Sequence, residues 1–294
     1  MAKHTIAVLG PGGVGGLVAG LAARSGHRVI VLAGGATAES LRAGGISVTS
    51  AHLGDFTAEV EVAEALVEPV DLCIVAVKQT SLSAALDRVP ADVVKGGLVL
   101  PLLNGVEHVA LLRDRFSSDS VAAGVIRVES TRTAAGQIVH GSPFIQIDVA
   151  SQTAPQAQLS DAGEVLSECG ITTRVLDDET AMLWGKLSVL APFALLTTHY
   201  DATIGEVRTT RRAELVRLVD EVAAIGFAAG GPDITESAMT FYDSFPYGAC
   251  SSMQRDASAG LPLEIDAIGG AVLRAAQRQG IPAPITQELV ASLA

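Results

Sequence analysis

One lysine in the second half of the chain has surroundings suited to acid catalysis. Lys186 lies within residues 184–190, where the other residues are mostly apolar and the spacing predicts a helix. An ammonium group is costly to bury unless it is paired, and its pKa then falls readily. Such a lysine can donate a proton to a carbonyl oxygen while hydride arrives at the carbon. The alternative is a lysine whose side chain extends along an amphipathic helix to solvent, but this helix offers little polar surface.

A glycine-rich turn near the N-terminus has the spacing of a dinucleotide site. Residues 10–15 read Gly-Pro-Gly-Gly-Val-Gly, directly after an apolar run and before a segment with helical spacing. Gly10 permits a tight turn, Gly12 lets backbone amides approach a pyrophosphate, and Gly15 lets the helix pack on the strand. A glycine-rich turn in a domain that binds no nucleotide is the alternative. The predicted cofactor-binding residues of this turn are Gly10, Gly12, Gly13, Val14 and Gly15.

The residues that would distinguish NAD(H) from NADP(H) are not decisive. The predicted strand at residues 28–32 is followed by Ala33-Gly34, without the acid that usually binds the ribose 2′-hydroxyl of NAD(H) and without an arginine for a 2′-phosphate. Lys78 directly follows another predicted strand, at the sheet edge where ligands bind, although a solvated loop lysine would occupy the same place. The pattern favours NADP(H).

Two further polar residues have both structural and functional interpretations. Asn104 precedes Gly105, a pair common in turns. Glu264 follows Gly260 and Pro262, and we expect it to cap or begin a helix that ends near Gln279. A glutamate at a helix start complements the helix dipole, but it can also pair with a lysine. The histidines lack metal-ligand spacing, so no metal site is predicted.

The elements that would position these residues change in type along the chain. Strands alternate with helices in the first half, and residues 137–149 resemble a closing hairpin. From residue 180 onward the spacing is mostly helical. The sequence therefore predicts an α/β chain, with an N-terminal doubly wound, Rossmann-type parallel sheet domain at residues 1–155. A mostly α-helical, substrate-binding C-terminal domain is expected at residues 156–294. The predicted strands lie at residues 5–9, 28–32, 46–49, 56–62, 71–77 and 98–103.

Composition narrows the function classes. The chain has 294 residues, 49% of them hydrophobic and 18% charged, and a net charge of −12. This composition excludes intrinsic disorder, and its acidity argues against nucleic acid or an anionic membrane as partner. Neither a signal peptide nor a long uninterrupted apolar run is evident, and the three cysteines are scattered. A cytoplasmic protein without a membrane span is expected.

The sequence resembles the ketopantoate reductase (2-dehydropantoate 2-reductase) family over almost its whole length. The glycine turn matches that family's opening, and Lys78 in Ala76-Val77-Lys78 matches its lysine after the fourth main strand. The resemblance implies contact between Lys78 and the adenosine 2′-phosphate side of NADPH. Asn104 in Leu103-Asn104-Gly105 matches an asparagine that contacts the nicotinamide ribose and the substrate.

The resemblance extends to the C-terminal half. Lys186 falls on the family's catalytic lysine, and Ser252 and Glu264 fall in its C-terminal signature. By that match Ser252 binds the substrate carboxylate, while Glu264 contacts the cofactor and orients the substrate and Lys186. The resemblance implies NADPH-dependent reduction of a 2-oxo acid, 2-dehydropantoate or a close analogue, with Lys186 as the general acid. A homodimer through the helical domain is also expected.

The chain departs from the family pattern at three positions. Gly34 stands where the family usually has an arginine, and Leu190 and Ala194 stand where it has asparagines, four and eight residues after the lysine. A site without these amides discriminates less for a hydroxylated substrate. Two alternatives therefore stay open. One is a D-2-hydroxyacid dehydrogenase acting on more apolar, branched 2-oxo acids, and the other is a redox sensor that binds NADP(H) without turnover.

Overall fold

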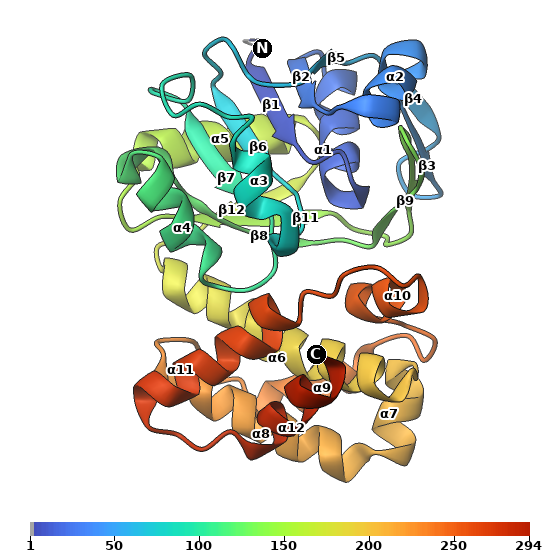
Figure 1. Cartoon of the computed structure of the whole chain (residues 1–294), viewed down its shortest axis with the longest axis vertical. Helices are drawn as coiled ribbons and strands as arrows, with labels where there is room; N and C mark the ends of the chain where they lie inside the picture. Colours follow the sequence, from blue (N-terminus) through green and yellow to red (C-terminus); the bar gives the residue numbers. More distant parts are fainter. Residues whose placement is uncertain (1–2) are drawn as a thin grey trace. The chain divides into compact units, whose positions relative to one another are not determined.

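A computed structural model describes residues 3–294, which form two compact units (Figure 1). Unit 1 contains the chain up to Leu103 and His108–Glu179. Unit 2 contains Asn104–Glu107 and Thr180–Ala294. The expected domain boundary at residue 155 thus lies inside unit 1, and a short segment of the first half of the chain belongs to unit 2.

Unit 1 is built on a five-stranded parallel sheet in the order β5-β2-β1-β6-β7. A Rossmann fold has the strand order 3-2-1-4-5-6, and this sheet corresponds to its first five positions, 3-2-1-4-5. The strand order reverses between β1 and β6, which is the switch point. Apolar runs rich in Val, Ile and Leu form β1, β2, β6 and β7 because helices and loops bury both faces of the sheet there, whereas the edge strand β5 is partly exposed. The prediction of a Rossmann-type domain is confirmed. The strands are β1 (Thr5–Leu9), β2 (Arg28–Leu32), β5 (Glu61–Ala63), β6 (Leu72–Val75) and β7 (Leu98–Pro101), and the helices that connect or follow them are α1 (Gly13–Arg24), α2 (Gly35–Gly44), α3 (Leu82–Leu86) and α4 (His108–Arg115).

Two smaller sheets complete unit 1, and they show that the hairpin predicted over residues 137–149 is wrong. β10 (Gln137–His140) pairs with β3 (Ile46–Ser50) and β9 (Ser130–Ala134), and β4 (Phe56–Ala58) extends that sheet. β11 (Gln146–Ala150) instead pairs with β8 (Ala123–Arg127) and β12 (Thr172–Val175). Where the chain leaves β10, His140 is buried and its two ring nitrogens contact the hydroxyls of Ser50 at 2.9 Å and Ser142 at 3.2 Å.

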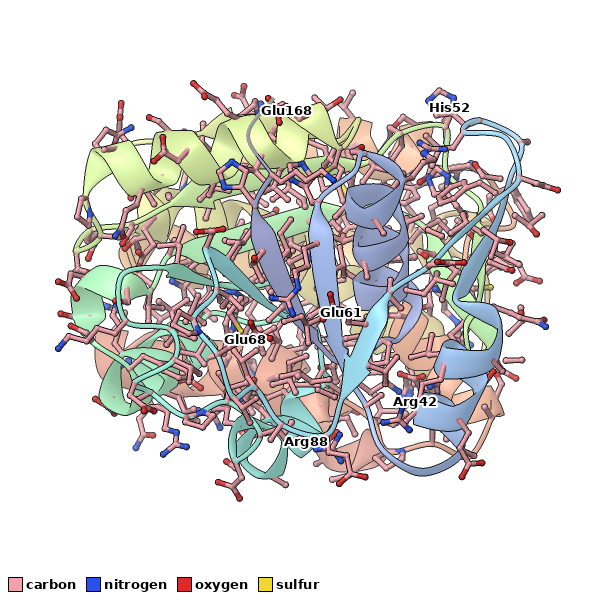
Figure 2. All side chains as sticks on the ribbon, turned by 90° about the horizontal axis from the view of Figure 1, so that it is seen from above. Arg42, His52, Glu61, Glu68, Arg88 and Glu168 are labelled. Atoms are coloured by element: carbon pink, nitrogen blue, oxygen red, sulfur yellow. The ribbon has the colours of Figure 1, made fainter. Side chains whose placement is uncertain are left out.

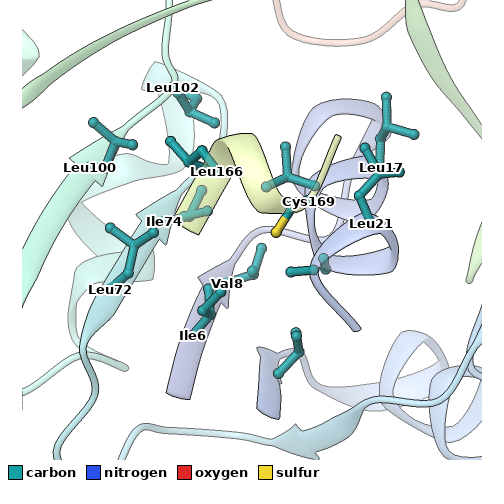
Figure 3. Close-up of a cluster of buried hydrophobic side chains, with 14 of the residues drawn as sticks. Ile6, Val8, Leu17, Leu21, Leu72, Ile74, Leu100, Leu102, Leu166 and Cys169 are labelled. Atoms are coloured by element: carbon teal, nitrogen blue, oxygen red, sulfur yellow. The ribbon is translucent and has the colours of Figure 1, made fainter. Parts of the chain in front are cut away.

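The segment after residue 155 joins unit 1 because its apolar face packs on the sheet core. Leu166 of α5 (Gln156–Glu168) and the adjoining Cys169 are buried with Ile74 of β6 and Leu17 of α1 (Figure 3). β12 then joins the three-stranded sheet through parallel pairing with β11. The sequence predicted helical spacing only from residue 180 onward, and the packing partner of this earlier segment was not visible in it.

Unit 2 is helical, and its longest helix, α6 (Glu179–Tyr200), starts at the last residue of unit 1. Within residues 3–294, α6 alone is long and apolar enough to cross a membrane. Its most apolar window is 61% buried inside the fold, and Leu187, Ala191 and Leu195 lie in the core of unit 2, so α6 packs as a core helix. The other helices are α7 (Ile204–Thr210), α8 (Arg212–Ala228), α9 (Thr235–Ser244), α10 (Ser252–Ser258), a π-helix at Asp266–Gly270, α11 (Ala271–Gln279) and α12 (Pro284–Leu293).

A buried carboxylate holds the three-stranded sheet of unit 1 together. Asp148 on β11 is fully buried and forms ion pairs with Arg127 on β8 and Arg174 on β12. Burial would raise the pKa of Asp148, but hydrogen bonds from Arg174, Gln146 and Arg127 outweigh it and lower the pKa from 3.8 to about 2. A carboxyl whose pKa is depressed by folding stabilises the folded state above its unfolded pKa, and this contribution is lost as the pH falls towards the folded value.

We therefore expect Asp148→Asn to lower the free energy of unfolding at neutral pH by about 2 kcal/mol. Urea unfolding measured from neutral pH downwards checks this, because the wild-type and variant free energies should converge as the pH falls from about 4 towards about 2. Asp92→Asn, at an exposed residue, is the control and should change little. If the free energy of unfolding of Asp148→Asn were lower than that of the wild type by the same amount at every pH, the stabilising role assigned to the ionised Asp148 would be contradicted.

Candidate active site

The glycine turn of unit 1 joins β1 to α1 and requires glycine at three positions, 10, 13 and 15. Gly10 has a φ of +95°, and a Cβ there would lie 2.6 Å from Cγ1 of Val77. A Cβ at Gly15 would lie 2.1 Å from the carbonyl oxygen of Gly10, so the helix can approach the turn only without a side chain. At Gly12, which caps α1, a Cβ would meet nothing within 4 Å. The backbone at Gly12 is therefore open to a ligand such as a pyrophosphate.

Gly13 and Val14 offer only their backbones to a cofactor. A Cβ at Gly13 would lie 2.3 Å from the carbonyl oxygen of Ser130 on β9, and the hydroxyl of Ser130 donates to the carbonyl of Gly13 at 2.7 Å. The Val14 side chain packs against the core of unit 1. The first turn of α1 is thus fixed by packing on both sides, which presents its amides rigidly.

Lys78 lies close to this turn in the fold. It follows β6 and precedes a short 3₁₀ helix, Gln79–Ser81, and its side chain is partly buried. Its carbonyl accepts a hydrogen bond from Ser81 at 3.3 Å. Because Gly10 abuts Ala76 and Val77, the chain leading to Lys78 borders the glycine turn. β1 and β6 end side by side here, at the switch point where Rossmann-type sheets bind ligands.

The sequence reasoning missed a cation at the end of β2. A Cβ at Gly34 would lie 3.4 Å from Nη2 of Arg88, so a guanidinium group lies beside the residue where an arginine was found to be missing. Arg88 follows α3, on a different connection of the sheet from Gly34. No local pattern marks it, because its position depends on how α3 returns across the sheet.

In unit 2, three of the predicted site residues form a hydrogen-bonded chain. Nζ of Lys186 on α6 donates to Oδ1 of Asn104 at 3.1 Å. Nδ2 of Asn104 donates to Oε2 of Glu264 at 3.2 Å. The amide therefore links an ammonium group to a carboxylate, and its two ends are oriented by the two charges. Glu264 is only 8% exposed, while Lys186 and Asn104 are partly exposed. An ammonium group held in this way can donate a proton to a substrate oxygen.

The segment that carries Asn104 is fixed against the π-helix of unit 2. Gly105 has a φ of +91°, and a Cβ there would lie 2.5 Å from the carbonyl oxygen of Ala267. Arg274 binds Glu107 and Asp266, with N–O distances of 2.7 Å to each. Glu264 directly precedes this irregular helix, as expected for a residue at a helix start, and its carbonyl accepts from the amide of Ile268 at 3.1 Å. π-Helical turns occur frequently at functional sites.

Ser252 stands apart from this chain of contacts. It is the first residue of α10 and is exposed, and within residues 3–294 it makes no hydrogen bond to Lys186, Asn104 or Glu264. Its neighbour Ser251 is buried, caps α10 through the amide of Gln254 at 3.0 Å, and accepts a hydrogen bond from Thr197 of α6 at 2.9 Å. The start of α10 is thereby attached to the helix that carries Lys186.

The residues that replace the family's asparagines lie on α6 after Lys186. One and two turns on, Leu190 is partly buried and Ala194 is 1% exposed. Because α6 is continuous from Glu179 to Tyr200, positions 186, 190 and 194 share one face. In the described part of the chain, residues 3–294, no group of three or more His, Cys, Asp or Glu side chains is placed to hold a metal ion.

Unit 1 is a Rossmann-type domain with an open glycine turn, and unit 2 has a lysine linked through an amide to a carboxylate. Together these features define an oxidoreductase that uses a nicotinamide cofactor. Residues 6–150 match the sequence model "Ketopantoate reductase PanE/ApbA", and residues 178–294 match that of the C-terminal domain, "Ketopantoate reductase PanE/ApbA C terminal". The chain belongs to the ketopantoate reductase family. The resemblance noted from the sequence is confirmed.

Individual relatives match along the whole chain. The 2-dehydropantoate 2-reductase of Mycobacterium tuberculosis is 30% identical, over 98% of this chain and 96% of the relative. The crystal structure of a PanE/ApbA family ketopantoate reductase from Ralstonia eutropha JMP134 has a TM-score of 0.88 at 25% identity, covering 98% of this chain and 96% of that one. A D-mandelate dehydrogenase, solved with NADH and anilino(oxo)acetate, has a TM-score of 0.89 with the same coverage, and at 20% identity it shows a shared fold only.

Proposed function

We propose that this protein reduces a 2-oxo acid, 2-dehydropantoate or a close analogue, to the 2-hydroxy acid with NADPH. The observation that carries the proposal is the hydrogen-bonded chain of Lys186, Asn104 and Glu264. When bound, the nicotinamide would supply hydride to the ketone carbon, which leaves the protein to deliver one proton to the oxygen. A photometric assay of NADPH consumption with a panel of 2-oxo acids tests the proposal.

The three hydrogen-bonded residues and Ser252 each have a separate role in the proposed reaction. Lys186 donates the proton to the ketone oxygen and stabilises the charge that develops there. Asn104 holds the ammonium group in place and faces the nicotinamide ribose and substrate. Glu264 fixes the Asn104 amide, helps to orient the substrate and Lys186, and contacts the cofactor. Ser252, exposed at the start of α10, binds the substrate carboxylate.

The cofactor is held by unit 1 in this proposal. The open backbone at Gly12 and the rigid first turn of α1 suit a pyrophosphate, which needs amide donors rather than side chains. Lys78, after β6, lies on the connection that borders the turn and contributes positive charge for the 2′-phosphate side of NADPH. This arrangement explains how a chain of net charge −12 can bind an anion, because the positive charge is local.

Leu190 favours a second candidate, a D-2-hydroxyacid dehydrogenase acting on branched and more apolar 2-oxo acids. This side chain is partly exposed on the face of α6 that carries Lys186, and Ala194 beyond it is buried. A hydroxyl group of the substrate that pointed towards this face would meet a hydrocarbon surface. An apolar branch would be accommodated there without loss of hydrogen bonds.

If the second candidate is correct, wild-type kcat/KM for branched apolar 2-oxo acids should equal or exceed that for 2-dehydropantoate. Leu190→Asn should shift the ratio towards 2-dehydropantoate by about 10-fold, because one hydrogen bond to the hydroxyl becomes available. Leu190→Ala is the matched control, since it removes the hydrocarbon without adding an amide. A wild-type preference for 2-dehydropantoate of about 100-fold would refute the second candidate and favour the first.

The proposed setting is the cytoplasm, with a homodimer formed through the helical unit. Unit 2 exposes several large apolar side chains, which would be covered in such a dimer. Sedimentation of the purified protein at several concentrations tests the assembly. The exposed residues are Phe227, Phe241, Tyr247 and Leu261.

A further inference from the structure

The end of β2 is the place where a Rossmann-type sheet distinguishes its two nicotinamide cofactors. A carboxylate there binds the ribose 2′-hydroxyl of NAD(H), whereas an arginine nearby accommodates the 2′-phosphate of NADP(H). In this chain the position is Gly34, which has no side chain to offer. The guanidinium group of Arg88 lies against it, since a Cβ at Gly34 would be 3.4 Å from Nη2 and 3.8 Å from Nη1.

Backbone hydrogen bonds hold Arg88 at this edge of the sheet. The amide of Leu66 donates to the carbonyl of Arg88 at 2.8 Å, which ties Arg88 to the segment that follows β5. β5 is the direct neighbour of β2, and Ala33 donates to Ala63 at 3.0 Å where the two strands end. The segment carrying Arg88 is therefore fixed next to the end of β2. Arg88 follows α3, whereas Arg42 lies near the end of α2, and both are labelled in Figure 2.

Among residues 3–294, no carboxylate pairs with the guanidinium group of Arg88. Four other arginines of unit 1 do bind carboxylates, and the clearest case is Arg28, which binds Glu61 on β5 and Glu68 on the loop that follows, both labelled in Figure 2. Arg88 is partly buried and forms no hydrogen bond or ion pair through its side chain to any residue in the range 3–294. A partly buried guanidinium without a carboxylate partner is suited to an anionic ligand.

We propose that Arg88 selects the phosphorylated cofactor by binding the 2′-phosphate of NADPH. The inference rests on the proposed use of NADPH and names the residue that determines it. A guanidinium group presents donors in a fixed planar fork, which matches a phosphate with two parallel hydrogen bonds. Lys78 lies after β6, and β1 separates β6 from β2, so Arg88 is the cation at the end of the discriminating strand itself.

The dissociation constants of NADPH and NADH, measured by isothermal titration calorimetry without substrate, test the proposal. Arg88→Ala should weaken NADPH binding by about 10- to 100-fold, because a charge-assisted contact is lost, and should leave NADH binding unchanged. Arg42→Ala is the matched control. It removes the same charge from an exposed position at the far end of α2 and should leave both constants unchanged.

A second variant tests the same place in the opposite direction. Gly34 has extended backbone, with φ −134° and ψ 171°, so a side chain fits there without strain. Gly34→Asp should reverse the preference, because the carboxylate pairs with Arg88, repels the 2′-phosphate and accepts a hydrogen bond from the 2′-hydroxyl. A wild-type chain that binds both cofactors equally overturns the NADPH proposal and the role of Arg88 together. A wild-type preference for NADPH that survives in both variants overturns the role of Arg88 alone.

Discussion

Lys186→Ala is expected to lower kcat for 2-oxo acid reduction by about 1,000-fold, the size of effect typical for loss of a general acid. The proton would then have to come from water, and the positive charge beside the developing alkoxide would be missing. The Kd of NADPH should stay near the wild-type value, because the glycine turn and Lys78 belong to unit 1 and are unchanged. Stopped-flow measurement of NADPH oxidation at saturating substrate, with titration of NADPH into each variant, measures both quantities.

Two further variants separate proton donation from simple charge. Lys186→Arg keeps the positive charge but holds its proton too strongly to transfer it, so its kcat should stay low while substrate binding recovers. Lys95→Ala is the control, because it removes an exposed lysine outside the site. Added alkylamines should partly restore turnover in Lys186→Ala. If the wild type binds NADPH without oxidising it for any 2-oxo acid, and Lys186→Ala behaves identically, the protein is a redox sensor.

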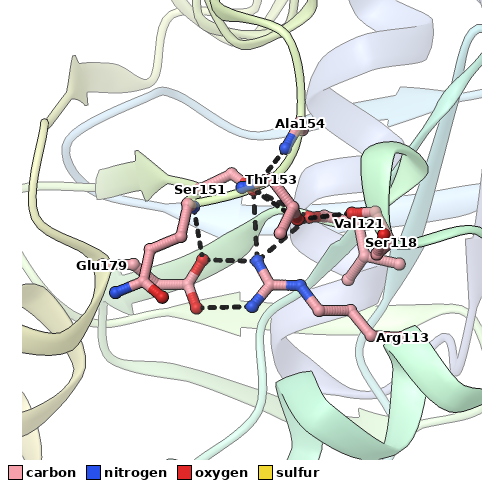
Figure 4. A network of polar contacts seen from close by, with 8 residues as sticks. Arg113, Ser118, Val121, Ser151, Thr153, Ala154 and Glu179 are labelled. Atoms are coloured by element: carbon pink, nitrogen blue, oxygen red, sulfur yellow. Dashed lines mark hydrogen bonds and ion pairs between the residues drawn. The ribbon is translucent and has the colours of Figure 1, made fainter.

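Arg113→Ala is expected to destabilise unit 1 by about 3–5 kcal/mol, because it leaves a buried carboxylate without its partner. Arg113 on α4 binds Glu179 through two hydrogen bonds, at 2.9 Å and 2.6 Å, and donates to the hydroxyl of Ser151 at 3.2 Å (Figure 4). The Glu179 side chain is only 7% exposed, and the amide of Gln152 also donates to it. Hydration of this largely buried carboxylate therefore offsets only part of the lost ion pair when the guanidinium is removed.

Urea unfolding of Arg113→Ala against wild type measures this loss. Arg115→Ala is the matched control, since it removes an exposed arginine from the same helix. The double variant Arg113→Met with Glu179→Gln should regain much of the stability, because no unpaired charge remains buried. If the free energy of unfolding fell no further in Arg113→Ala than in Arg115→Ala, the Arg113–Glu179 pair would contribute little to the stability of the fold.

The sequence predicted the parts of the fold that depend on local pattern. The parallel strands β1, β2, β6 and β7 were visible because each is a short, mostly buried apolar run, and the glycine turn because Gly10 and Gly15 occupy positions that no other residue can fill. The edge strand β5 is a partly exposed Glu-Val-Ala segment, and the sequence merged it with β4 into one strand over residues 56–62. The change to helical spacing near residue 180 was also visible. The sequence did not show which strands pair with each other. The pattern around residues 137–149 identified β10 and β11 as strands but paired them with each other, although each has its partners in a different sheet.

The sequence did not predict the boundary between the two units, for the same reason. The helical spacing of α5 indicates an apolar face, but not whether that face meets a sheet or other helices. The structure places Leu166 and Cys169 in the sheet core, and so assigns residues 156–179 to unit 1. The reassignment of Asn104–Glu107 to unit 2 is likewise a matter of tertiary packing, since Gly105 lies against Ala267.

For this protein, the sequence by itself determined the fold class, the family and the separate candidates Lys186, Asn104 and Glu264, because residue type and spacing are local properties. Only the tertiary structure decided that the Asn104 amide links the other two, and that Arg88 stands beside Gly34. Both contacts join residues far apart in the chain, and no local periodicity encodes such a distance. They arise when parallel strands and their crossovers bring distant loops to one edge of a sheet, and when packed helices bring distant side chains together.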